Sequence, residues 1–174
     1  MRALVVFESL WGDVERIARA VADVLEETMI VEVVISDSAP SDIDGFDLLV
    51  VGAPTHRQSM SRPATREEAH RVYGAPHVLT RGVREWLYDL NAPHTKATAL
   101  AFSTALDEPR LPGSAAKAIR YELRSLGLDT PVKAETFRVA TYQGPLLDGE
   151  IERAVAWIRS AIAGESVLSE DTAS

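Results

Sequence analysis

The chain has 174 residues, of which 46% are hydrophobic and 25% are charged, and its formal net charge is −8. These values are typical of one globular domain, and the charge disfavours a general binder of nucleic acid or of anionic membranes. The chain has no cysteine, which excludes disulfides, thiolate metal sites and cysteine nucleophiles. With no apolar stretch long enough for a secretory signal or a membrane span, we expect a cytoplasmic protein. Its acidity fits either solubility alone or steering toward a basic redox partner.

Apolar, β-branched runs alternate with amphipathic helical patterns along the chain. In chain order they predict a strand at Ala3–Phe7, a helix at Asp13–Glu27, strands at Ile30–Ile35 and Leu48–Gly52, a helix at Thr80–Leu90, a strand at Thr98–Phe102, a helix at Ser114–Leu126, a strand at Val132–Val139 and a helix at Asp148–Ala163. The link 36–47 has no helical stripe, so its helix is short or absent. Residues 1–163 are predicted to form the domain, and the polar residues 164–174 a disordered tail.

This alternation predicts βαβ units, and therefore an α/β fold with a parallel sheet and helices on both faces. With right-handed crossovers, 2-1-3-4-5 is the simplest order for the five strands. Ligands of such folds bind beyond the C-terminal ends of the strands, where the strand order reverses. Three loops therefore form the candidate site: Glu8–Val14, Ala53–Thr80 and Ser103–Gly113.

The first loop joins a buried strand directly to a helix. The free N–H groups and the dipole of a helix N-terminus favour an anion there. Asp13 has two interpretations: it caps the helix with no ligand, or it stands beside a bound phosphate and repels it. Trp11 is either a stacking platform for a ring or a hydrophobic lid over the loop.

The loop sequences resemble those of flavodoxin-like proteins, and in particular the flavodoxin-domain proteins of high-GC Gram-positive bacteria. The first loop in those proteins typically reads Y-E-S-M-F-G-N-T, the second G-G-P-T-H-A-F-G-M-S-R-P-x-T-R and the third F-D-T-R. The corresponding segments here are Phe7-Glu8-Ser9-Leu10-Trp11-Gly12-Asp13-Val14, then Gly52-Ala53-Pro54-Thr55-His56-Arg57-Gln58-Ser59-Met60-Ser61-Arg62-Pro63-Ala64-Thr65-Arg66, and then Phe102-Ser103-Thr104-Ala105. Gly144-Pro145-Leu146 and Gly149-Glu150 match as well. The resemblance extends from Met1 to about Ala163.

The resemblance implies a three-layer flavodoxin-like sandwich that binds FMN and transfers electrons. It places the phosphate in the first loop and the flavin ring between the second and third loops. The implied cofactor-binding residues are Ser9, Leu10, Trp11, Gly12, Asp13, Val14, Pro54, Thr55, His56, Arg57, Ser103, Thr104 and Ala105. If the protein is an enzyme, the implied class is an FMN-dependent oxidoreductase. The implied partner is a redox protein or a small-molecule electron donor or acceptor, with a homodimer as a further option.

Departures from the family pattern fall in the first loop, where Ser9 is the one hydroxyl residue and Asp13 replaces Asn. Loss of a charged hydrogen bond costs roughly 1.5–3 kcal/mol. An alternative function is therefore a flavodoxin-like domain that has lost FMN and serves as an interaction or small-anion-binding module. Arg57 either supplies the missing anion contact or is a solvated loop residue. Arg62 and Arg66 are predicted to pin the second loop or to pair with Glu67 and Glu68.

Other chemistries lack their sequence signatures. His56, His70, His77 and His94 do not have the spacing of metal ligands, so we expect no metal site. Neither a nucleophile elbow nor a P-loop lysine is present, and we assign no catalytic residue. The third strand ends in Val51-Gly52-Ala53-Pro54, which excludes the acceptor aspartate of a receiver domain.

Overall fold

A computed structural model describes residues 1–91 and 95–171, with side chains through residue 164. The elements in chain order are β1 (Arg2–Phe7), α1 (Asp13–Leu25), β2 (Ile30–Ile35), the 3₁₀ turn η1 (Ser36–Ser38), β3 (Leu48–Pro54), α2 (Pro63–Tyr73), α3 (Val83–Asp89), β4 (Thr98–Leu106), α4 (Ala115–Ser125), β5 (Glu135–Val139) and α5 (Glu150–Asp171).

The described strands form one five-stranded sheet in the order β2-β1-β3-β4-β5, with parallel pairing between all neighbours. Val5 of β1 lies between Val33 of β2 and Val50 of β3. The predicted fold class and strand order are therefore confirmed. Strand order reverses between β1 and β3, so the loops that follow these two strands flank the switch point.

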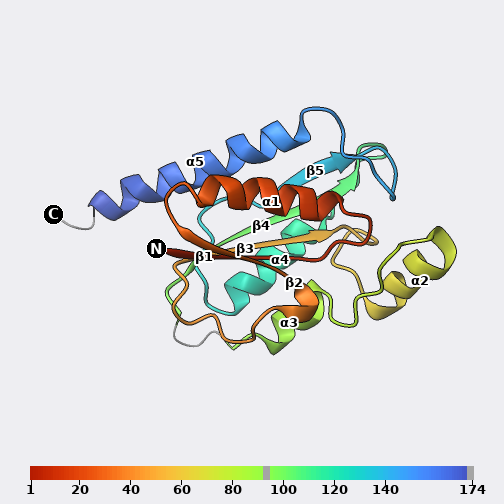
Figure 1. Ribbon diagram of the computed structural model, residues 1–174, viewed down its shortest axis with the longest axis horizontal. Coiled ribbons are helices and arrows are strands. Elements are labelled where there is room, and N and C mark those ends of the chain that lie inside the picture. The colour runs from red at the N-terminus through yellow and green to blue at the C-terminus, as the bar shows by residue number, and fades with distance from the viewer. Residues whose placement is uncertain (92–94, 172–174) are drawn as a thin grey trace.

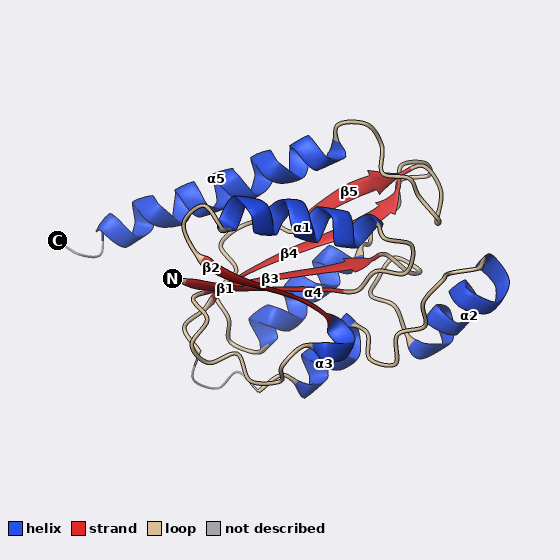
Figure 2. Cartoon of the chain, viewed as in Figure 1, coloured by secondary structure: helices blue, strands red, loops and turns tan. Residues whose placement is uncertain are grey.

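Helices cover both faces of the sheet, as Figures 1 and 2 show. Because side chains alternate along a strand, Ala3, Val5 and Phe7 of β1 face a core shared with α1 and α5. Leu4 and Val6 face the opposite core, which α3 and α4 cover. This burial on both faces explains the uninterrupted apolar run of β1.

Helix α2 was not predicted, and it occupies eleven residues of the second loop. In Figure 1 it lies beyond the C-terminal ends of the strands, outside the two helical layers. Only Arg66 and Ala69 of this helix are buried, so it lacks the apolar stripe that periodicity detects. The second loop thus contains regular structure and lies as a wall beside the switch point.

Several predicted boundaries differ from the structure, including the end of β3, which continues to Pro54, and the start of α3 at Val83. Strand β4 continues to Leu106, so that Ser103, Thr104 and Ala105 pair with β5 instead of opening the third loop. Strand β5 begins at Glu135 rather than at Val132. Helix α5 continues to Asp171, past the boundary predicted at residue 163, and residues 172–174 of the predicted tail lie outside the described part. No helix within the described residues combines the length and apolarity needed to span a membrane.

Candidate functional site

The first loop turns at Gly12, whose φ of 100° is in the left-handed region. Glycine adopts this conformation without steric cost. The N–H groups of Leu10, Trp11, Asp13 and Val14 donate to no acceptor in the part of the chain that the structure describes. These donors lie at the N-terminus of α1, where the helix dipole also favours an anion.

Ser9 satisfies two other N–H groups at the N-terminus of α1. Its Oγ accepts from Gly12 N at 3.1 Å and from Glu15 N at 3.4 Å. The cap position of α1 is Gly12, which offers no side chain, so Ser9 takes the role of the capping residue. The hydroxyl that the sequence assigns to a phosphate therefore already bonds the helix terminus.

Asp13 does not cap α1, contrary to that interpretation of the sequence. Its carboxylate accepts from the backbone N–H of Leu146, in the loop between β5 and α5. The same loop brings Gly144 so close that a Cβ there would overlap Asp13 Oδ2. Burial raises the pKa of Asp13, against the opposing effects of the Leu146 N–H and of Arg16. Asp13 thus anchors the β5–α5 loop to the first turn of α1.

Leu10 and Val14 are buried, each with 2% of its surface exposed. Leu10 packs against Ala69 and Ala75 and so fixes α2 to the first loop. Val14 belongs to the core under α1. Apolar side chains at these two positions therefore have packing roles, and a hydroxyl at Val14 would enter the core.

A buried polar network joins the first loop to α2 and α3. The Ser61 hydroxyl donates to Glu8 Oε1, and Val83 N donates to Glu8 Oε2 at 2.9 Å. Arg66, 1% exposed, donates to Ser61 Oγ at 2.8 Å and pairs with Glu85 at 3.0 Å. Burial raises the pKa of Glu8, although both hydrogen bonds and the charge of Arg66 oppose this. This network positions the walls of the site.

Arg66 does pin the second loop, as predicted, but its carboxylate partner is Glu85 instead of Glu67 or Glu68. Arg57 forms an ion pair with Glu68, in which Nη2 lies 3.4 Å from Oε2, and 78% of the Arg57 side chain is exposed. Arg57 is thus a largely solvated residue with a weak ion pair, as one of the two sequence interpretations proposed.

Thr55 and Gln58 hold the start of the second loop against the chain that follows β4. Thr55 Oγ1 accepts from Ala115 N at 3.1 Å, and Thr55 N donates to Thr104 O at 2.9 Å. Gln58 lies against Gly113, where a Cβ would overlap Gln58 atoms. These contacts join the second and third loops at the point where the resemblance places the flavin ring.

His56 lies on the other side of this loop, with Nδ1 at 2.9 Å from Thr65 Oγ1. Burial, and secondarily the charge of Arg66, lowers the pKa of His56 to about 4, against the opposing effect of Glu68. The imidazole is therefore neutral near neutral pH.

Pro54, Ser103, Thr104 and Ala105 belong to strands, below the loops. Pro54 ends β3 and pairs with Thr104. Ser103 is fully buried, and its Oγ lies 3.2 Å from Thr136 Oγ1 of β5. These four residues therefore lie in the C-terminal parts of β3 and β4 rather than in a separate loop.

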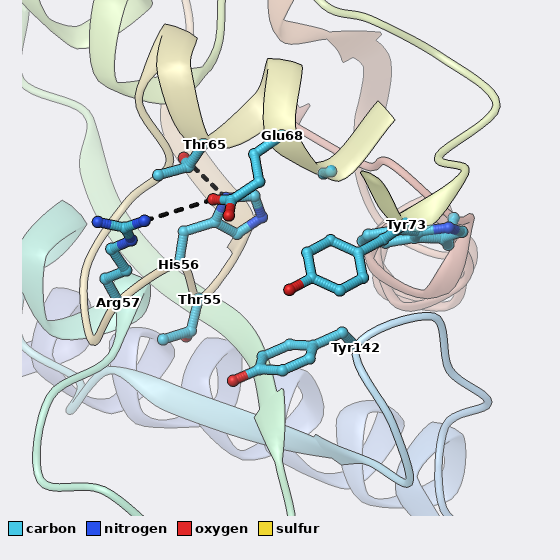
Figure 3. A pocket seen from close by; sticks show the side chains of 9 residues that line it. Thr55, His56, Arg57, Thr65, Glu68, Tyr73 and Tyr142 are labelled. Carbon is cyan, nitrogen blue, oxygen red and sulfur yellow. Dashed lines mark hydrogen bonds and ion pairs between the residues drawn. The ribbon is translucent and has the colours of Figure 1, made fainter. Parts of the chain in front are cut away.

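A cleft of about 220 Å³ opens between α2, the start of the second loop and the β5–α5 loop. It is lined by Trp11, Thr55, His56, Arg57, Thr65, Glu68, Ala69, Tyr73 and Tyr142. Figure 3 shows the rings of Tyr73 and Tyr142 extending toward the side formed by Thr55 and His56. Gln143 Nε2 donates to Tyr73 O at 2.9 Å and so holds the two tyrosine-bearing segments together.

A second cavity, of about 450 Å³, borders the first loop. Ser9, Trp11, Gly12, Glu15, Ile35 and residues 76–79 line it. Trp11 lines both cavities. Four predicted site residues therefore meet in the aromatic cleft: Trp11, Thr55, His56 and Arg57.

Sequence reasoning missed Tyr73, Tyr142, Thr65 and Glu68 as members of the cleft. Tyr73 and Tyr142 lie outside every motif that the sequence analysis used, so the sequence offered no signal for them. Across the described residues, no group of three His, Asp or Glu side chains is arranged to hold a metal ion, and His94 lies outside them.

No protein-family model matches the sequence, and no curated protein matches it either. Solved structures do resemble it. A flavodoxin from the domain Archaea is 16% identical with a TM-score of 0.60, over 91% of this chain and 94% of that one. Oxidised flavodoxin 1 from Bacillus cereus is 17% identical with a TM-score of 0.65, over 94% of this chain and 98% of that one. The flavodoxin of Streptococcus pneumoniae TIGR4 is 18% identical with a TM-score of 0.66, over 94% of this chain and 99% of that one. With the observed strand order, these likenesses show that the chain has the flavodoxin-like fold.

Proposed function

We propose that this protein binds FMN and transfers electrons through it, as the resemblance of its three loops implies. The aromatic cleft beside the free amides of the first loop is the observation on which the proposal rests. A volume of about 220 Å³ suits one planar ring system, since pockets for whole drug-sized ligands start at about 300 Å³.

The residues present fit such a ligand in two parts. The N–H groups of Leu10, Trp11, Asp13 and Val14 are free for phosphate oxygens. Trp11, Tyr73 and Tyr142 offer aromatic faces for a ring. Bound FMN would supply reversible electron transfer, and a redox protein or a small molecule would exchange those electrons with it.

Titration of the purified protein with FMN tests the proposal. We expect flavin fluorescence to be quenched with a dissociation constant of tens of micromolar or lower. Riboflavin, which lacks the phosphate, should bind more weakly because it cannot use the amides. Tyr142→Ala should weaken binding, whereas Tyr121→Ala, which removes an equally exposed tyrosine from α4, should not. Absence of quenching at tens of micromolar protein would contradict the proposal.

A second candidate function is a flavodoxin-like domain without FMN, and a specific observation favours it. Ser9 Oγ already accepts from the N–H groups of Gly12 and Glu15, and the Asp13 carboxylate lies in the first turn of α1. A negative charge at about 4 Å opposes another by about 1 kcal/mol in water and by more in a drier site.

Asp13→Asn separates the two candidates. The amide oxygen can still accept from Leu146 N, so the β5–α5 loop should stay in place while the charge is lost. If the wild type binds FMN, the variant should bind it several-fold more tightly. FMN binding by the variant alone would favour the second candidate for the natural chain.

A further inference from the structure

A groove rich in positive charge runs beside α4 and the segment that leads into β5. Its volume is about 720 Å³. We call it the basic groove and define it by Lys117, Arg120, Tyr121, Arg124 and Lys133. The first four lie three and four residues apart on α4, so they share one face of the helix. No carboxylate lines the groove.

The four cations of the basic groove are not neutralised by the described part of the chain. None of them belongs to an ion pair there, although nine such pairs occur elsewhere. Arg120 donates to the carbonyl oxygens of Thr130 and Val132, and Lys117 donates to that of Pro112. Carbonyl oxygens fix the direction of these side chains but leave their charge in place.

This concentration of charge is unusual for the chain, whose formal net charge is −8. The side chains of Arg124 and Lys133 are exposed and make no hydrogen bond within the described residues. An anion that entered the groove would therefore meet two unengaged cations and two that are already oriented.

The spread of the charges indicates the size of the ligand. Lys117 and Arg124 are seven positions apart, which corresponds to about 10 Å along a helix. A single phosphate group cannot contact both ends, so the groove fits an extended anion with several charges. Tyr121, 70% exposed, adds the aromatic contact that is enriched in protein interfaces.

Three classes of extended anion are compared by their charge and geometry: duplex DNA, a second copy of this chain and an acidic segment of another protein. Duplex DNA carries one charge per about 1.7 Å, so the remaining acidic surface of this chain would repel it strongly. A second copy, docking an acidic patch into the groove, would make a heterologous contact that leads to rings or filaments. An acidic segment on another protein carries only a few local charges and has neither drawback.

We propose that the basic groove docks an acidic segment of a partner protein. The proposal does not depend on FMN, because no groove residue lines either cavity beside the first loop. Charge complementarity of this kind mainly accelerates association and selects the partner. Binding should therefore weaken steeply as ionic strength rises.

A dye-labelled oligoglutamate peptide is the probe, with fluorescence anisotropy at low ionic strength and no added flavin. The wild type should bind it, and Arg124→Glu with Lys133→Glu should lower the affinity about tenfold or more. The matched control is Arg71→Glu with Lys96→Glu, which makes the same change in net charge at two exposed cations elsewhere. The control should retain most of the wild-type affinity.

Circular dichroism of both double variants checks that they fold, and Arg124→Ala with Lys133→Ala provides a milder version. Equal binding by the groove and control variants, or no binding by the wild type, would overturn the proposal. Tighter binding of a single-stranded oligonucleotide of equal charge would assign the groove to nucleic acid instead. Self-association that only the groove variant loses would assign it to a second copy. A failure of FMN binding affects none of these outcomes.

Discussion

Acidification should destabilise the fold through His56. Burial, and secondarily the charge of Arg66, lowers the pKa of its imidazole from 6.5 to about 4. Protonation would place a cation in the cleft wall, near the Arg66 guanidinium. The Thr65 hydroxyl, 2.9 Å from Nδ1, is a hydrogen-bond partner for the neutral ring.

The sign and size of the effect follow from the two pKa values. Between about pH 6.5 and pH 4 the unfolded chain binds a proton at His56 and the folded chain does not, so folding stability falls as the pH falls. The interval between the two values, at about 1.4 kcal/mol per pH unit, gives at most about 3.4 kcal/mol. About 2 kcal/mol of this should be lost by about pH 5.

Urea unfolding of the wild type and of His56→Gln, measured from about pH 7 to pH 5, tests this prediction. The wild type should lose about 2 kcal/mol more than the variant over that range. Arg57→Gln is the matched control, because it alters the exposed neighbour but keeps the imidazole. Glu8, whose raised pKa acts in the opposite direction by favouring low pH, is present in all three proteins and cancels. A parallel fall in the wild type and His56→Gln would refute the reasoning.

Substitutions at three further positions test the fold itself, each by the midpoint of urea unfolding. Glu8→Ala should cost about 1–3 kcal/mol because it leaves the buried Ser61 hydroxyl and the Val83 N–H without their acceptor, whereas Glu8→Gln, which keeps one acceptor oxygen, should cost less; equal losses would show that these hydrogen bonds add nothing there. Gly52→Ala should cost at least about 1–3 kcal/mol, since its Cβ would overlap the Phe102 ring, and a neutral result would mean that the ring moves freely. Ser114→Ala should cost about 1 kcal/mol, because Ser114 Oγ caps α4 by accepting from Lys117 N, and an unchanged midpoint would show that the cap adds nothing.

The sheet and its order could be predicted because they depend on local patterns. Apolar runs buried on both faces and helices with one apolar stripe are visible in a single sequence. The end of β4 could not be predicted this way. Ser103, Thr104 and Ala105 are small or polar, and their pairing with neighbouring strands, β5 for all three and β3 for Ser103 and Thr104, makes them a strand.

Helix α2 escaped prediction for a related reason. Its buried face contains Arg66, whose charge is balanced by Glu85 from α3. Such a face has no hydrophobic period, because a contact distant in sequence replaces the apolar side chains. Pro63 at the first helical position was the one local signal of a start. Tyr73 and Tyr142 are 69 positions apart in the sequence, so only the fold could place them in one cleft.

The first loop has two roles that the sequence alone does not separate: its side chains hold neighbouring segments, and its backbone amides are available to an anion. Leu10 holds α2, Asp13 holds the β5–α5 loop, and Ser9 caps α1. Leu10 and Asp13, which look wrong for phosphate, are therefore explained by the neighbouring segments that they position. Those neighbours bring Tyr73 and Tyr142 to the cleft. Anion binding in this loop would consequently rest on backbone amides, while its side chains build the aromatic walls beside it.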